Sequence, residues 1–315
     1  MKLIIQIPCL NEEQSLPATL KDLPQKIEGI DTIEILVIDD GSSDRTAQVA
    51  REQGAHHIVR FTKRCGLARA FSAGLDAGLK TGADIIVNTD ADGQYKGEDI
   101  PRLVRPILNG EADVVIGNRD IENVRQFSFL KKRLQRLGSW VVRNLSGTTV
   151  PDATTGFRAY SREAALRMNI VSAYTYTLES LIQAQHKNLA IANITIHTNE
   201  VTRESRLFKS MWQYIARSMV TILRIYAMYN PLKTFVIAGC GLSLAGFLIG
   251  CRFVYYYLLG YGSGHTQSLI LAAILLIVGF QMFIVGLVGD LIAANRRLIE
   301  DTLYRVREIE SRENS

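Results

Sequence analysis

The sequence has few cysteines, and their spacing excludes the usual disulfide and zinc frameworks. Only four of the 315 residues are cysteine, and none of them forms a close C-x-x-C pair. Two of the four lie in apolar segments. We therefore expect free, buried thiols and a reducing compartment around the polar part of the chain. The four are Cys9, Cys65, Cys240 and Cys251.

Several other signatures are missing as well. No G-x-G-x-x-G motif follows the first strand-like segment, and no P-loop lysine motif occurs. The sequence therefore lacks the usual evidence for a dinucleotide-dependent oxidoreductase or an ATPase. The apolar run at residues 3–8 is too short and too interrupted for a signal peptide, which predicts that the front of the protein stays in the cytosol. The formal net charge of +5 comes without a basic and aromatic array, so we expect membrane lipid rather than nucleic acid as the partner.

The first part of the chain alternates strand and helix patterns. This order predicts an α/β domain with a mostly parallel sheet covered by helices. Strands are predicted at residues 3–8, 34–38, 57–61, 84–89, 113–117 and 190–196, and helices at residues 11–23, 44–53, 67–81, 137–145 and 177–185.

Three polar clusters follow predicted strands, at residues 8–12, 39–44 and 90–94. In a parallel sheet, ligands bind at the carboxyl ends of the strands. Because all three clusters fall at such ends, we expect them to meet on one edge of the sheet and to form a site there.

The third cluster carries two carboxylates one residue apart, Asp90 and Asp92, directly after a buried strand. In an extended backbone, residues i and i+2 point the same way, so both carboxylates can converge on one cation. Oxygen ligands with open coordination sites suit Mg²⁺ or Mn²⁺ bridging a diphosphate. The alternative is a polar turn without a metal, since Asp and Gly are common turn residues.

The second cluster follows another buried strand. A carboxylate there, Asp40, can accept a hydrogen bond from a ring N–H of a nucleotide base, while Asp44 can cap the next helix. Capping alone explains Asp44 well, and we expect it to explain Asp40 poorly.

The C-terminal part contains two apolar segments, residues 234–259 and 268–291. Each supplies the roughly 20 residues needed to cross a bilayer. Lys233 precedes the first segment, Arg296 and Arg297 follow the second, and the loop between them has no Lys or Arg. The positive-inside rule then predicts two spans with both ends in the cytosol. A soluble hydrophobic hairpin is the competing explanation.

Amphipathic segments flank the two spans. Residues 207–232 interleave aromatic and basic side chains, as a helix at a bilayer surface does, although a core-facing helix would also fit. Residues 292–315 carry a helical apolar stripe between charges. This tail packs either against the α/β domain or against a second copy of the chain, which would make a homo-oligomer; the pattern does not choose between the two.

The motifs PCLNEE (8–13), VIDDGSSD (37–44) and DADGQ (90–94) together resemble the three signatures of the family 2 glycosyltransferases with the GT-A fold. GNR (117–119), TGFRAY (155–160) and RESRLF (203–208) resemble later blocks of that family. The whole chain is similar to the polyisoprenyl-phosphate glycosyltransferase group. The resemblance implies a cytosolic GT-A domain at residues 1–206, an interfacial helix at 207–232, a two-span hairpin at 233–291 and a cytosolic tail helix at 292–315.

The resemblance also implies roles for individual residues. The metal, Mg²⁺ or Mn²⁺, would be held by Asp90, Asp92 and Gln94. The donor nucleotide-sugar would contact Pro8, Leu10, Glu12, Ile38, Asp40, Asp90, Ala91 and Gln94. The catalytic group would comprise Asp92, Asp152, Arg119 and Arg206, with the arginines on donor or acceptor phosphates and Asp152 orienting an arginine or the sugar rather than acting as a base.

The chain departs from the family pattern at two places. Gly93 and residues 95–97 stand where relatives have Leu and a Pro-rich turn, and Arg203 and Arg206 replace a glycine and a lysine. These differences affect local geometry more than the class of reaction.

The implied function is metal-dependent, inverting transfer of one sugar, from a donor such as UDP-glucose, to a polyisoprenyl phosphate at the cytosolic membrane face. GDP-mannose is the alternative donor. A processive synthase would need a Q-x-x-R-W block and more spans, which the sequence lacks. A catalytically inactive membrane scaffold is the alternative from another class, and the intact Asp90/Asp92 pair argues against it.

Overall fold

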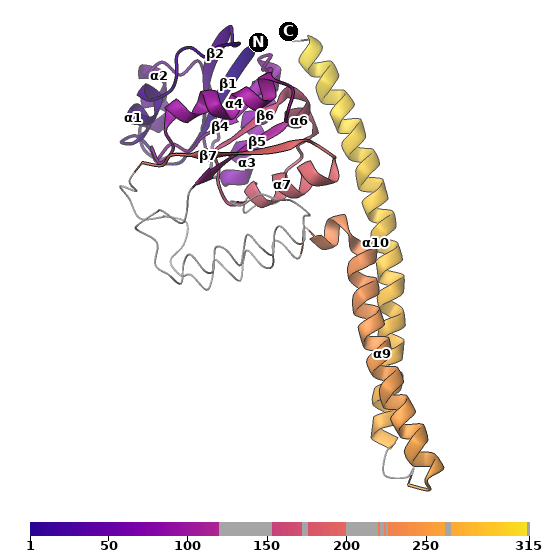
Figure 1. Ribbon diagram of the computed structural model, residues 1–315. Helices are drawn as coiled ribbons and strands as arrows, with labels where there is room; N and C mark the ends of the chain where they lie inside the picture. Colours follow the sequence, from indigo (N-terminus) through magenta and orange to yellow (C-terminus); the bar gives the residue numbers. More distant parts are fainter. Residues whose placement is uncertain are drawn as a thin grey trace. The chain divides into compact units, whose positions relative to one another are not determined.

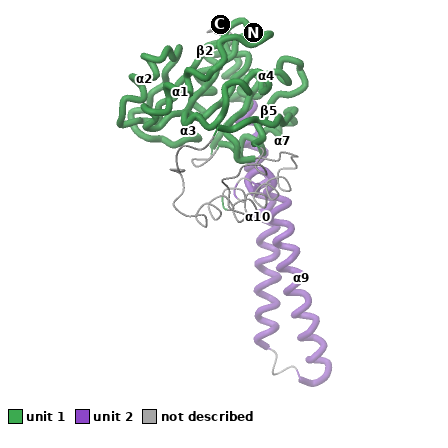
Figure 2. Tube along the Cα trace, turned by 60° about the vertical axis from the view of Figure 1, so that its left-hand side comes forward, with its two compact units in different colours: residues 1–222, 302–315 green, residues 223–301 purple. Residues whose placement is uncertain are grey.

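The computed structural model describes residues 1–119, 153–171, 176–199, 220, 224, 226–261 and 266–313. The predicted helix at 137–145 and most of the predicted interfacial helix at 207–232 lie outside these residues. The chain forms two compact units, one of residues 1–222 with 302–315 and the other of residues 223–301 (Figure 2).

The first unit is built on a seven-stranded sheet in the order β3-β2-β1-β4-β6-β5-β7 (Figure 1). Strand β6 runs antiparallel to both of its neighbours, β4 and β5, whereas the other pairings are parallel. The prediction of a mostly parallel α/β sheet is therefore confirmed. The strands are β1 (Lys2–Cys9), β2 (Thr32–Asp39), β3 (His57–Arg60), β4 (Ile85–Asn88), β5 (Val114–Arg119), β6 (Arg158–Ser161) and β7 (Ile191–Ile196).

Apolar side chains cover both faces of the sheet, which is why its central strands, the first and fourth in the chain, are mostly apolar runs rather than alternating ones. Ile4 packs into one core and its neighbour Ile5 into the other. The Ile4 face is covered by α3 (Leu67–Lys80), α6 (Arg162–Arg167) and α7 (Thr177–His186). The Ile5 face is covered by α1 (Leu16–Lys21), α2 (Thr46–Glu52) and α4 (Ile100–Leu108), the last preceded by the 3₁₀ turn η1 (Gly97–Asp99).

The helix predicted at residues 11–23 is shorter than expected. Helix α1 spans only Leu16–Lys21, and Asn11 adopts a left-handed backbone conformation with φ of 54°. The backbone N–H of Asn11 donates to Ser42 Oγ at 2.9 Å, so these residues are bound to the loop after β2 instead of continuing the helix.

The second unit contains α9 (Pro231–Leu258) and most of α10 (Thr266–Glu313). Both helices are long and apolar enough to cross a membrane, and only 11% and 17% of their most apolar windows are buried. The two helices approach closely. A Cβ added to Gly239 would lie only 2.9 Å from the Gly279 carbonyl oxygen, so only a residue without a side chain fits there. The hairpin therefore presents its apolar side chains outward, which favours membrane helices over a water-soluble hairpin.

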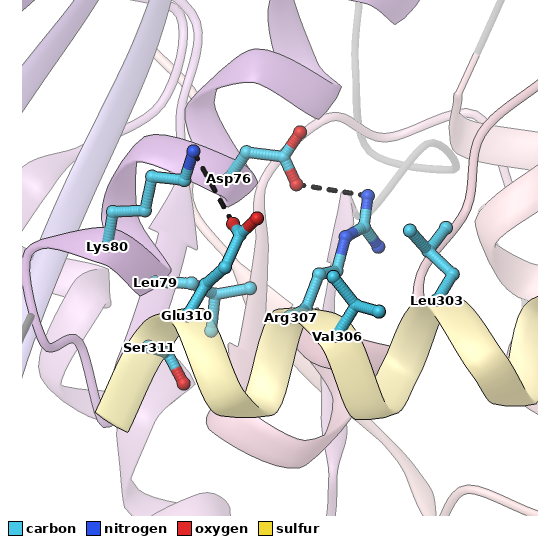
Figure 3. Close-up of a pocket in the computed structure, with 8 residues that line it drawn as sticks. All are labelled: Asp76, Leu79, Lys80, Leu303, Val306, Arg307, Glu310 and Ser311. Carbon is cyan, nitrogen blue, oxygen red and sulfur yellow. Dashed lines mark ion pairs between the residues drawn. The ribbon is translucent and has the colours of Figure 1, made fainter. Parts of the chain in front are cut away.

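The predicted tail helix is the continuation of α10, and its last turns belong to the first unit. Tyr304 Oη donates to Glu163 at 3.0 Å, and Arg307 donates to the Met168 carbonyl at 2.7 Å. Arg307 also pairs with Asp76 of α3 at 3.0 Å (Figure 3). The sequence left open whether the tail packs against its own chain or against a second copy. In the structure it packs against the α/β domain of its own chain.

Candidate functional site

The loops after β1 and β2 are joined to each other by side-chain hydrogen bonds. Asn11 Oδ1 accepts the backbone N–H of Ser43 at 2.9 Å, and Thr46 Oγ1 accepts the N–H of Glu12 at 2.9 Å. Asp44 lies one residue before the cap position of α2, Arg45, and its Oδ1 accepts the first helical N–H, that of Thr46, at 3.0 Å. Asp44 therefore stabilises the start of α2, close to the predicted capping role. The first two polar clusters therefore meet on one edge of the sheet.

Asp40 has a structural role beside its predicted contact to a nucleotide. Its Oδ1 accepts the backbone N–H of Cys65 at 2.6 Å, and its Oδ2 accepts that of Gly66 at 2.9 Å. Gly66 is the N-terminal cap position of α3. Asp40 therefore holds the segment before α3 and caps neither α2 nor α3, and its predicted contact to a nucleotide base stays a prediction.

The apolar residues predicted at the nucleotide site are mostly within the core. Pro8 is buried in β1, Ala91 is 4% exposed, and Ile38 is fully buried in β2. The Ile38 side chain packs on α3, where a Cβ at Gly74 would lie 2.9 Å from Ile38 Cδ1. Leu10, directly after β1, is the more accessible member of the set. At Ile38 and Ala91 we therefore expect backbone rather than side-chain contacts to a nucleotide.

The third cluster follows β4 and forms a tight turn. Asp90 is half-buried and Asp92 exposed, and Asp92 Oδ1 accepts the backbone N–H of Gln94 at 3.0 Å. Gly93 has φ of 69°, which a glycine adopts without strain. Asn199 fixes the turn from outside, because its Nδ2 donates to the Gly93 carbonyl at 2.9 Å.

The two carboxylates are close enough to influence each other. Burial raises the pKa of Asp90 to about 7, and the negative charges of Asp92 and Glu12 act in the same direction, while Arg119 opposes them. A bound cation would therefore favour the state in which both carboxylates are ionised. The side chains of Glu12, Asp90, Asp92 and Arg119 belong to one electrostatic cluster.

Arg119, at the end of β5, is the cation of this cluster. Its Nη2 donates to Thr154 Oγ1 at 3.0 Å, so the guanidinium is attached to the segment before β6. The other two predicted catalytic residues, Asp152 and Arg206, lie outside the described residues.

The donor set of the acidic pair fits a hard divalent cation. Among the residues that the structure describes, no group of three or more His, Cys, Asp or Glu side chains could hold a metal ion. Two carboxylates, with Gln94 beside them, would leave coordination positions for water and for the oxygens of a diphosphate. That is the manner in which Mg²⁺ is usually bound.

Four residues behind the acidic pair, three with polar side chains and one glycine, were not identified from the sequence as site residues. Arg158 is fully buried and donates to the carbonyls of Ala153, Thr155 and Thr177 at 2.9, 2.9 and 2.7 Å. It therefore holds the segment that carries Gly156, next to Asp90. Two features of the sequence could have indicated these residues: the TGFR motif at 155–158, and Asn88, the amide residue that ends the apolar run of β4. The four residues are Asn88, Gly156, Arg158 and Tyr176.

Known proteins resemble this chain in sequence and in fold. The model of the family described as glycosyl transferase family 2 matches residues 4–167, which is more than half of the chain. Undecaprenyl-phosphate mannosyltransferase of Micrococcus luteus is 29% identical over 71% of this chain and 93% of its own. Undecaprenyl-phosphate 4-deoxy-4-formamido-L-arabinose transferase of Photorhabdus laumondii is 27% identical over 97% of this chain and 92% of its own.

Solved structures show the same fold. Glucosyl-3-phosphoglycerate synthase of Mycobacterium tuberculosis, in complex with Mn²⁺ and UDP, superposes with a TM-score of 0.54. The two chains are 22% identical, and the match covers 70% of this chain and 79% of that enzyme. The match of the family model, which includes the three polar clusters at the sheet edge, establishes that this chain belongs to glycosyl transferase family 2.

Proposed function

We propose that the protein transfers a single sugar from a nucleotide-sugar to a polyisoprenyl phosphate, with inversion at the anomeric carbon. Two relatives whose names state an undecaprenyl-phosphate acceptor match 71% and 97% of this chain. The two apolar helices of the second unit supply a reason for a lipid acceptor, since they are long enough to hold the enzyme in the membrane that contains it.

The observation that carries the proposal is the acidic pair Asp90 and Asp92 on the edge of the sheet, with Arg119 in the same electrostatic cluster. Asp90, Asp92 and Gln94 would hold Mg²⁺ or Mn²⁺. When bound, the ion would neutralise the charge that develops on the leaving nucleoside diphosphate. Solved structures of the M. tuberculosis relative contain Mn²⁺ or Mg²⁺ together with UDP, which supports this assignment.

The acceptor phosphate is ionised near neutral pH, so it needs to be oriented more than deprotonated. Arginine suits this task because its guanidinium forms paired hydrogen bonds to phosphate oxygens. Arg119 and Arg206 would take this role on the donor or acceptor phosphates, and Asp152 would orient an arginine or the sugar. No dedicated general base is required.

The donor is a UDP-hexose such as UDP-glucose in this proposal, and UDP in the structures of the M. tuberculosis relative favours it. A GDP-mannose donor is the second candidate, favoured by the mannosyltransferase name of the M. luteus relative. Glu12 and Asp40 would bind the ribose and base of either nucleotide.

The basic residues at the ends of the spans favour an orientation with both termini and the catalytic unit in the cytosol. The proposed organisation is a cytosolic catalytic domain at 1–206, an interfacial helix at 207–232, two spans at 233–291 and a cytosolic tail at 292–315. The proposed location is therefore a multi-pass membrane protein that works at the cytosolic face.

The proposal is tested with full-length protein in detergent. Labelled UDP-glucose or GDP-mannose is incubated with undecaprenyl phosphate and Mn²⁺, and radioactive lipid is extracted. We expect product from one donor, loss of at least 100-fold with Asp92→Asn, and unchanged turnover with Asp31→Asn, whose side chain is 86% exposed. Folded protein that gives no lipid product with any nucleotide-sugar would favour the inactive scaffold, and an active Asp92→Asn variant would remove the metal role.

A further inference from the structure

The two metal-site carboxylates are fixed in different ways. Asp92 accepts a hydrogen bond from the backbone of Gln94. In the described part of the chain, no hydrogen bond holds the carboxylate of Asp90. Its oxygens instead face the bare Cα of Gly156, where an added Cβ would lie 3.1 and 3.2 Å from Oδ1 and Oδ2. The orientation of Asp90 therefore depends on where Gly156 is held.

Gly156 is held at both of its backbone groups by side chains. Its N–H donates to Tyr95 Oη at 3.2 Å. Its carbonyl oxygen accepts from Asn88 Nδ2 at 2.8 Å and from Tyr176 Oη at 3.3 Å. These three side chains come from β4, from the turn after it and from the start of α7, so they fix the glycine from several directions.

Tyr176 has the central place in this arrangement. Its hydroxyl accepts a hydrogen bond from Asn88 Nδ2 at 2.9 Å and donates to the Gly156 carbonyl. A Cβ at Gly156 would lie only 2.7 Å from this hydroxyl, so Tyr176 Oη and the Asp90 carboxylate flank the same point. Burial and the charge of Asp90 raise the pKa of Tyr176 well above its ordinary value, so the hydroxyl keeps its proton and its donor role.

We propose that Tyr176 is a positioning residue for Asp90, acting through Gly156 to fix the direction in which the carboxylate meets the divalent cation. This inference rests on the proposed function, because it assumes that Asp90 binds the metal. Residues that orient metal ligands without touching the metal typically change metal affinity about 10- to 100-fold when they are removed. The hydroxyl of Tyr176 is such a group, and it acts on Asp90 through Gly156 rather than by direct contact.

The chain offers a matched pair of variants. Tyr176 stacks on Phe71 with ring centroids 4.0 Å apart, and Tyr160 contacts the same Phe71 edge-on at 5.6 Å. Both tyrosines are fully buried. The Tyr160 hydroxyl, however, has no hydrogen-bond partner among the described residues. Tyr176→Phe and Tyr160→Phe therefore delete the same atom from the same core, but only the first touches the support of Gly156.

The test measures Mn²⁺ binding directly, by the electron paramagnetic resonance signal of free Mn²⁺, with full-length protein in detergent and saturating UDP. We expect Tyr176→Phe to weaken Mn²⁺ binding about 10-fold, and Tyr160→Phe to leave it within 2-fold of the wild type. Thermal unfolding of metal-free protein controls for general loss of structure. If Tyr176→Phe does not unfold cooperatively, Asn88→Ser replaces it, with the same expected weakening.

Equal Mn²⁺ affinity in Tyr176→Phe and wild type would overturn the positioning role while leaving the proposed function intact. Equal weakening in both tyrosine variants would also overturn it, because the effect would then come from the core in general. A wild-type protein that binds no Mn²⁺, with or without UDP, would instead contradict the proposed metal site itself, and the inference would fail with it.

Discussion

Both carboxylate oxygens of Asp40 accept a hydrogen bond from the backbone N–H of Gly66, at 3.1 and 2.9 Å, and the carboxylate thereby attaches the loop after β2 to the start of α3. Gly41, the next residue, has φ of 73°, and a Cβ there would come within 2.5 Å of the backbone of Lys63. The predicted nucleotide-binding loop is therefore built around Asp40, which links binding to local stability.

The first prediction concerns this link. Asp40→Ala removes the acceptor for two backbone N–H groups, which we expect to cost about 1–3 kcal/mol of stability and to abolish the thermal shift produced by UDP. Asp40→Asn keeps one acceptor oxygen and should lose less stability. The measurement is thermal unfolding with and without UDP. Retention of the full nucleotide shift in Asp40→Ala would show that the loop binds nucleotide without this carboxylate.

The second prediction follows from the pKa of Asp90, which is raised from 3.8 to about 7 in the folded protein. Between these two values the folded state binds more protons than the unfolded state, so the stability of metal-free protein should fall as the pH rises from about 4 to 7. Asp90→Asn removes this dependence. In EDTA the variant should match the wild type near pH 4 and exceed it at pH 8, by on the order of 1–3 kcal/mol.

Thermal unfolding at several pH values, in EDTA and in Mn²⁺, measures this difference. Mn²⁺ should stabilise the wild type at pH 8 and should not stabilise Asp90→Asn. A variant that is less stable than the wild type at pH 8 without metal would contradict the predicted cost of ionising the buried Asp90 beside Asp92.

The third prediction concerns the tail helix on α3 and α6. Arg307→Ala removes the hydrogen bond to the Met168 carbonyl and the ion pair with Asp76, and we expect a loss of about 1–2 kcal/mol. Arg305, two residues earlier on the same helix, is exposed, so Arg305→Ala is the matched control. Urea unfolding and limited proteolysis of the tail measure the effect. Equal effects of the two substitutions would mean that the tail is not fixed through Arg307.

The sequence predicted six of the seven strands, and the most apolar of them, such as β1 and β4, stand out locally as buried runs. It missed β6, which begins with a fully buried arginine, Arg158, instead of an apolar residue. Its register partner on β4 is Asn88, 70 positions earlier in the chain, and no local pattern records such a distant antiparallel pairing. Long-range contacts of this kind also built the support of Asp90, so Tyr176 could not be identified from spacing alone.

The polar clusters were easier to predict than the roles of their members. The strand-end rule brought residues 8–12, 39–44 and 90–94 to one edge, because it depends only on the direction of the strands. Whether a carboxylate there meets a ligand or the protein's own backbone depends on the neighbouring loop. Asp40 and Asp92 look equivalent in sequence, yet the former is 4% exposed and bound to α3, whereas the latter is exposed.

The fourth prediction distinguishes two cysteines near the sheet edge. Cys9 is 2% exposed, and burial raises the pKa of its thiol well above the ordinary value, whereas Cys65 is exposed. Because the thiolate is the reactive form, N-ethylmaleimide at pH 7 should label Cys65 and leave Cys9 unmodified until the protein unfolds. Mass spectrometry of the two peptides measures this. Labelling of Cys9 in native protein would mean that β1 is more open than described.

The last prediction concerns Arg158, whose guanidinium is fully buried and donates to three carbonyl oxygens and to Ser180 Oγ at 2.7 Å. Arg158→Lys keeps the charge but cannot reach these acceptors with one nitrogen, so a buried cation would be left poorly paired. We expect the free energy of unfolding to fall by about 3–5 kcal/mol, with Mn²⁺ binding lost as well because the segment carrying Gly156 is released.

Arg162→Lys is the control, since Arg162 is only partly buried. Its side chain donates to Ala83 O and to Ser311 Oγ, away from the acidic pair. Thermal unfolding and Mn²⁺ binding should separate the two variants, and an Arg158→Lys protein as stable as Arg162→Lys would show that β6 does not depend on this network.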